Sequence, residues 1–79
     1  MGRKHESRFL SELARRLKSM REDRKLTLQE VYDATGVHIA RIESSKSNVT
    51  LLTLMTLCRH YRVRLMEVLD GLDEFVEEG

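Results

Sequence analysis

Hydrophobic residues recur at spacings of three and four along much of this chain, the pattern of helices that bury one face. Over residues 7–23 the positions expected to be buried are Phe9, Leu13, Leu17 and Met20. Over residues 50–61 they are Leu51, Leu54, Leu57, Cys58 and Tyr61, with Leu52 and Met55 nearer the edge. No stretch shows the strict alternation of a half-buried strand, so the pattern predicts an all-α fold.

Two shorter helices fall between these longer ones. Thr27 has a glutamate three residues later, the capping-box pattern in which the two side chains satisfy N–H groups at a helix start. Gly36 ends this first helix, because glycine readily adopts the positive φ of a sharp turn. The second helix carries Ile39 and Ile42 on its buried face and ends in the polar run 44–48. This order of elements is a helix-turn-helix pattern.

A fifth helix is expected from about residue 64, and two structures are open for the residues that follow it. On one continuous helix, apolar residues recur every three or four positions and acidic residues fill the rest of the circumference. Gly71 would cost such a helix only about 1 kcal/mol. This alternative predicts a two-fold dimer joined through Leu69, Leu72, Phe75 and Val76. In the other alternative Gly71 caps the helix and the tail frays.

Length and composition fit one small globular domain, since the 79 residues are 41% hydrophobic and 34% charged. We expect a disordered arm over residues 1–6, a domain of five short helices over 7–71, and an acidic extension over 72–79. The lone Cys58 cannot form an internal disulfide, and no stretch resembles a membrane span or a secretory signal. These features predict a cytoplasmic protein.

Charge is unevenly placed along the chain although the net charge is only +1. Residues 1–48 hold eleven Lys and Arg against seven Asp and Glu, whereas residues 49–79 hold three against six. The asymmetry fits ordinary solvated charge or a protein that presents a basic face to a polyanion. Beside a helix-turn-helix pattern, it favours nucleic acid.

Taken together, several short pieces resemble the phage repressor and Cro-like helix-turn-helix family, also called the XRE family, over about residues 8–70. The matching pieces are Leu17, Met20-Arg21, Leu26-Thr27, Thr35-Gly36-Val37, Arg41-Ile42-Glu43, Lys46, Asn48 and the pattern from Leu51 to Leu69. The resemblance implies a compact five-helix repressor-like domain whose second and third helices form the helix-turn-helix. It also implies sequence-specific binding of double-stranded DNA by a small transcriptional regulator, most often a repressor.

Three departures from the family pattern lie within the helix-turn-helix. The segment from Gly36 to Glu43 is about three residues shorter than usual, Tyr32 replaces a small residue, and Leu28 replaces a phosphate-contacting glutamine. We expect the Tyr32 ring to fill the space that the shortened helix leaves. On that hypothesis Tyr32→Ala opens a cavity that costs about 3–5 kcal/mol.

The expected DNA contacts follow from helix geometry and from the resemblance. Candidate base contacts are Arg41, His38, Val37 and Ser45. Candidate phosphate contacts are Leu28 and Gln29, through N–H groups at their helix start, and Ser44, Lys46, Ser47 and Asn48. Arg41 could bind guanine O6 and N7 together, or lie in solvent; His38 and Asn48 could instead cap helices. The resemblance further implies that Arg21 and Glu43 form a structural ion pair.

No arrangement of residues indicates an enzyme, a metal site, a cofactor or a small-molecule ligand. The three histidines are scattered, and Cys58 and His60 are two residues apart, so they point to different sides of one helix. The sequence therefore predicts a homodimeric regulator on a palindromic operator. The alternative is a protein-interaction module on the same fold, such as an antitoxin or adaptor with weakened base readout.

Overall fold

The computed structural model describes residues 3–44 and 48–75, and within them the chain forms only helices and connections. The elements are α1 (Arg3–Asp23), α2 (Leu28–Thr35), α3 (Ile39–Glu43), α4 (Leu51–Tyr61), α5 (Leu65–Leu69) and a 3₁₀ helix, η1 (Leu72–Phe75). The predicted all-α fold is confirmed. The first helix begins earlier than the sequence indicated, at Arg3 in place of residue 7.

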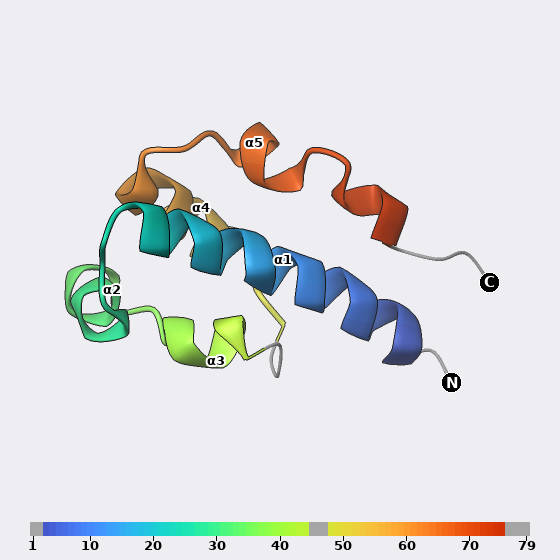
Figure 1. Cartoon of the computed structure of the whole chain (residues 1–79), viewed down its shortest axis with the longest axis horizontal. Coiled ribbons are helices and arrows are strands. Elements are labelled where there is room, and N and C mark those ends of the chain that lie inside the picture. The colour runs from blue at the N-terminus through green and yellow to red at the C-terminus, as the bar shows by residue number, and fades with distance from the viewer. Residues whose placement is uncertain (1–2, 45–47, 76–79) are drawn as a thin grey trace.

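Helix α1 is the longest element and runs along the molecule, with α2 and α3 on one side of it and α5 and η1 on the other (Figure 1). Leu13 and Leu17 on its inner face are almost fully buried. The core that surrounds them draws on every other element: Val31, Ile39, Ile42, Leu54, Leu57, Cys58, Tyr61, Val68 and Leu72. Because α3 packs against α1, the long helix positions the helix-turn-helix directly.

The predicted helix boundaries around the turn are confirmed in detail. Thr27 Oγ1 accepts a hydrogen bond from the Glu30 N–H at 3.0 Å, and Glu30 Oε1 accepts one from the Thr27 N–H at 2.7 Å. Gly36 takes φ 76° and donates its N–H to the Tyr32 carbonyl at 2.8 Å. Thr50 caps α4 by accepting the Thr53 N–H at 3.1 Å. These local patterns fix where α2 and α4 begin and where the chain turns.

The expected burial of Leu51 is wrong. Its side chain is 62% exposed, and with Leu52 and Met55 it forms an outer apolar face on α4. The buried face of α4 begins one turn later, at Leu54. Helical spacing predicts the direction of a side chain, but whether another element lies over it depends on the packing of the whole chain.

A helix that continues past Gly71 is also wrong. Helix α5 ends at Leu69, Gly71 adopts φ 72°, and the chain turns into η1, which packs on α1. Leu72 is only 1% exposed and belongs to the core of the protomer. The tail therefore does not fray directly after Gly71 either, because η1 folds back as a short helix.

Two arginines of α1 contact this C-terminal segment. Arg16 Nη1 donates hydrogen bonds to the carbonyls of Val68 at 2.7 Å and Asp70 at 2.6 Å, which are freed where α5 ends. The Arg8 guanidinium lies 5.9 Å from the centre of the half-buried Phe75 ring. Val76, the last of the four residues predicted to join a dimer, lies outside the described residues.

Candidate nucleic-acid interface

The helix-turn-helix consists of α2, the turn at Gly36 and a five-residue α3. Ile39 and Ile42 anchor α3 in the core with exposed fractions of 1% and 6%. Ala40 and Arg41 lie on its exposed side. This short helix therefore has one face fixed to the domain and one face available to a partner.

A buried ion pair ties the end of α3 to α1. Arg21 donates from Nε to Glu43 Oε2 at 2.7 Å and from Nη2 to Oε1 at 3.0 Å, and its Nη1 donates to the Leu26 carbonyl at 2.7 Å. The hydrogen bond to Glu43 raises the pKa of Arg21 above its ordinary value. Both side chains are close to fully buried, so the expected Arg21–Glu43 pair is present as a structural clamp.

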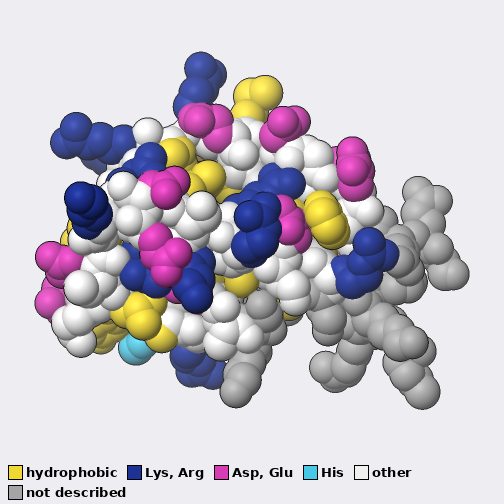
Figure 2. All heavy atoms as spheres, viewed as in Figure 1, with side chains coloured by type: hydrophobic (Ala, Val, Ile, Leu, Met, Phe, Trp, Pro, Cys, Tyr) yellow, Lys and Arg dark blue, Asp and Glu magenta, His cyan; other side chains and the backbone are white. Residues whose placement is uncertain are grey.

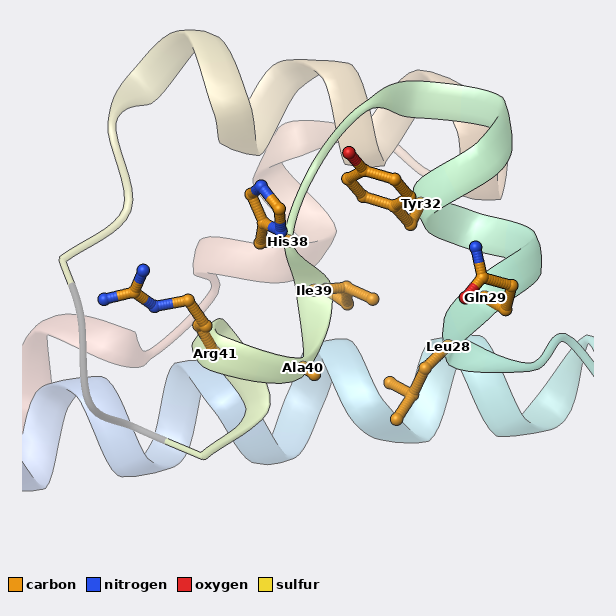
Figure 3. A pocket seen from close by; sticks show the side chains of 7 residues that line it. All are labelled: Leu28, Gln29, Tyr32, His38, Ile39, Ala40 and Arg41. Carbon is orange, nitrogen blue, oxygen red and sulfur yellow. The ribbon is translucent and has the colours of Figure 1, made fainter.

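Helices α2 and α3 enclose an open hollow of about 420 Å³ (Figure 3). Its lining residues are Leu28, Gln29, Tyr32, His38, Ile39, Ala40 and Arg41. Figure 3 shows Arg41 at one end and Leu28 and Gln29 at the other. Four of the lining residues, from His38 to Arg41, fall between Gly36 and Glu43, the segment expected to be about three residues shorter than the family pattern.

Tyr32 borders this hollow and does not fill it. Its side chain is 41% exposed, and its ring packs against the His38 ring with centroids 4.8 Å apart at a tilt of 37°. The expectation that the Tyr32 ring occupies the vacated space is therefore wrong. With so much of the ring in solvent, Tyr32→Ala should cost about 1 kcal/mol or less, not the 3–5 kcal/mol of a buried aromatic ring.

The four candidate base contacts differ in their exposure and in their contacts. Arg41 is exposed, and its guanidinium has no hydrogen-bond or ion-pair partner among the described residues. His38 is exposed and occupies the N-cap position of α3, but its side chain makes no capping hydrogen bond, so that capping alternative is wrong. Val37 packs partly against the core, which limits its reach toward DNA. Ser45 lies outside the described residues.

The first turn of α2 is suited to a phosphate. The capping box uses the N–H groups of Thr27 and Glu30, which leaves those of Leu28 and Gln29 at the helix start for an anion. The Gln29 side chain is already engaged, since its Nε2 donates to Asp33 Oδ1 at 2.8 Å. A phosphate contact at these two residues, as predicted, would therefore use their backbone N–H groups.

After α3 the candidate phosphate contacts are only partly described. Ser44 is exposed, and its hydroxyl donates to the Arg41 carbonyl at 2.7 Å while its oxygen can still accept. Asn48 is exposed, and the N-cap of α4 is Thr50, so Asn48 is not the cap of that helix. Lys46 and Ser47 lie outside the described residues.

Several of the basic residues that make the N-terminal part of the chain positively charged have structural partners. Besides Arg16 and Arg21, Arg24 donates from Nε to the Tyr61 carbonyl at 2.6 Å, where α4 ends. Figure 2 shows Lys and Arg side chains mixed with Asp and Glu over the face in view. The sequence signal for these roles was their position on α1, three to four residues from the buried Leu13 and Leu17 or from each other.

The chemistry of the remaining residues is limited. No group of three or more His, Cys, Asp or Glu within residues 3–44 and 48–75 could hold a metal ion. Burial raises the pKa of the Cys58 thiol, which disfavours the reactive thiolate. None of the described helices is both long and apolar enough to cross a membrane.

A family model described as helix-turn-helix matches residues 17–68, from the middle of α1 to α5. The match covers the clamp, both helices of the motif and α4. The chain therefore belongs to the XRE family of helix-turn-helix DNA-binding proteins. No curated protein and no solved structure matches it.

Proposed function

We propose that this DNA-binding protein is a transcriptional repressor that binds a palindromic operator as a homodimer in the cytoplasm. The observation that carries the proposal is the exposed Arg41 guanidinium on α3, which has no partner among the described residues. Arg16, Arg21 and Arg24 donate to carbonyls and carboxylates, whereas none of the Arg41 guanidinium donors is used within residues 3–44 and 48–75.

In this mechanism α3 enters the major groove and the rest of the domain sets its position. The Arg21–Glu43 pair fixes the end of α3 against α1, and the start of α2 binds a backbone phosphate through N–H groups. Arg41 then reads guanine through O6 and N7, the acceptor pair that matches its planar fork. No step requires bond making or breaking.

A homodimer is part of the proposal because one protomer offers few base-reading side chains. Each good base contact is worth about 1–3 kcal/mol of discrimination, so two copies on one operator double what α3 supplies. A dimer through a continuous C-terminal helix would need Leu72 on an outer face, but Leu72 is buried in the core of the protomer. The outer face of α4, with Leu51, Leu52 and Met55 each more than half exposed, is the surface that we propose for the contact.

Sedimentation of the intact chain tests the dimer. We expect a two-fold dimer, which Leu52→Glu converts to a monomer by placing a charge in the contact. Met66→Glu is the matched control, since Met66 is 74% exposed on α5 and should leave the dimer intact. A monomeric wild-type chain, or a Leu52→Glu variant that stays dimeric, would contradict this part of the proposal.

Binding measurements on DNA test the division of roles. Arg41→Ala should cost about 1–3 kcal/mol on the selected site and relax base preference at one position per half-site. Lys46→Ala should weaken binding to all sequences alike and reduce the salt dependence by about one unit of slope. Indistinguishable effects of the two variants across site sequences would show that Arg41 does not read a base.

The second candidate is a protein-interaction module such as an antitoxin or adaptor. Two observations favour it: α3 has only five residues, and α4 exposes large apolar side chains beyond it. In that case the same DNA measurements would show equal affinity for all sequences.

A further inference from the structure

The hollow between α2 and α3 has Arg41, the proposed guanine-binding residue, at one end, and the rest of its lining is mostly apolar (Figure 3). Its floor is the buried Ile39, and its walls include Leu28, Ala40 and the paired rings of Tyr32 and His38. Leu28 stands where the family pattern has glutamine, so the wall nearest the start of α2 is apolar in this chain. Gln29 also lines the hollow, and its amide Nε2 donates to Asp33 Oδ1 at 2.8 Å.

This surface is formed before any ligand arrives. The Tyr32 and His38 rings contact each other at 4.8 Å, within the range of aromatic pairs, and Ile39 is fixed in the core. The hollow is therefore an apolar depression on the same face as Arg41 and not a gap that the protein fills itself (Figure 3). If this face of the protein lies against the major groove, the apolar hollow is complementary to an apolar group on the base edges.

The only apolar group that base pairs present in the major groove is the methyl on C5 of a pyrimidine. We infer that the hollow binds the C5-methyl group of thymine or 5-methylcytosine at the base step next to the guanine that Arg41 reads. This inference rests on the proposed DNA-binding function and adds a second specificity determinant to it. Arg41 reads the guanine edge by hydrogen bonds, while Leu28 and Ala40 select the neighbouring methyl by contact.

Selection from three random duplex libraries tests the inference with the intact protein. The first library is made with thymine and cytosine, the second with uracil in place of thymine, and the third with uracil and 5-methylcytosine. We expect thymine next to guanine in the first library. That preference should fall about fourfold in the second, the equivalent of about 0.8 kcal/mol for one methyl-sized group. In the third library it should move to 5-methylcytosine at the same position.

The guanine preference separates this inference from the proposed function. If guanine is enriched in all three libraries but the neighbouring preference ignores the methyl, the hollow does not read it and the inference is overturned. If no library yields any enrichment, the proposed function fails, and the inference fails with it.

A pair of variants shows whether the hollow is responsible. Ala40→Ser adds a hydroxyl to the wall of the hollow at an exposed position with no proposed guanine or phosphate contact, so the methyl preference should fall from about fourfold toward none while guanine enrichment persists. Ala34→Ser is the matched control, because it makes the same change at an exposed position of α2 that does not line the hollow. An Ala40→Ser variant that keeps the full methyl preference would overturn the assignment.

Discussion

Replacing Arg21 by methionine tests whether the buried clamp stabilises the fold or contacts DNA. The Arg21 and Glu43 side chains are only 11% and 8% exposed, and the guanidinium donates three hydrogen bonds, two of them to Glu43. Arg21→Met leaves a buried carboxylate without its partner and the Leu26 carbonyl without a donor. Such a change costs about 3–5 kcal/mol. A domain of this length has roughly 4–12 kcal/mol in total, so much of its stability should be lost.

Urea denaturation followed by circular dichroism measures this loss, and a double-mutant cycle assigns it to the pair. Arg21→Met with Glu43→Met should recover at least about 2 kcal/mol, because it removes both buried charges. Arg15→Met is the control, since Arg15 pairs with Glu12 at 2.7 Å but is 68% exposed; its loss of stability should be far smaller than that of Arg21→Met. An Arg21→Met variant as stable as wild type that no longer binds DNA would refute the structural role.

Two further substitutions test the core. Leu72→Ala should lower the free energy of unfolding by about 2–5 kcal/mol in urea, whereas Leu69→Ala, at a 37% exposed position, should cost much less; equal losses would contradict the docking of η1. The Tyr61 hydroxyl is buried without a hydrogen-bond partner in the described part of the chain, so Tyr61→Phe should leave stability at pH 7 unchanged or raise it by about 1 kcal/mol. Burial raises the pKa of Tyr61 from 10 to about 12 and so favours its neutral form in the folded state. The resulting contribution to stability is complete below pH 10 and lost as pH rises toward 12. Tyr61→Phe, measured by denaturation at several pH values, should remove this decline, whereas Tyr32→Phe at an exposed ring should keep it; a marked loss at pH 7 in Tyr61→Phe would contradict the burial argument.

Local patterns predicted the parts of the fold that depend on neighbouring residues. The Thr27–Glu30 capping box, the positive φ of Gly36 and the Thr50 cap are each set by interactions within four residues of the chain. On α1, helical spacing predicted the buried Leu13 and Leu17, whereas Phe9 and Met20 are only partly buried and the buried Ala14 was not predicted. The Arg21–Glu43 pair, 22 residues apart, came from the family resemblance and not from spacing.

What the sequence did not predict depends on packing between distant elements. Leu51 has the right angular position for burial, but the buried face of α4 starts only at Leu54. Leu72 fits an amphipathic helix, but Gly71 turns the chain and η1 buries Leu72 inside the protomer. Both errors arise because periodicity gives a direction and not the element that lies there.

The candidate site, too, was predicted where neighbouring residues determine it and not where distant elements pack together. The charge asymmetry was compatible with ordinary solvated charge or with a face that binds a polyanion, and it did not indicate that Arg16 and Arg24 satisfy carbonyls at the ends of α5 and α4. The spacing from Gly36 to Glu43 indicated that α3, the second helix of the motif, is short. The open hollow beside Tyr32 was not predicted, because the outward position of that ring depends on its contact with His38.

Selection of bound sequences from random DNA duplexes tests the central claim most directly. Our account predicts enrichment of a palindrome with a guanine at the same position in each half-site, and loss of that guanine preference in Arg41→Ala. No enrichment of any sequence, even at low salt where nonspecific attraction is strongest, would contradict the assignment of this protein as a sequence-specific regulator.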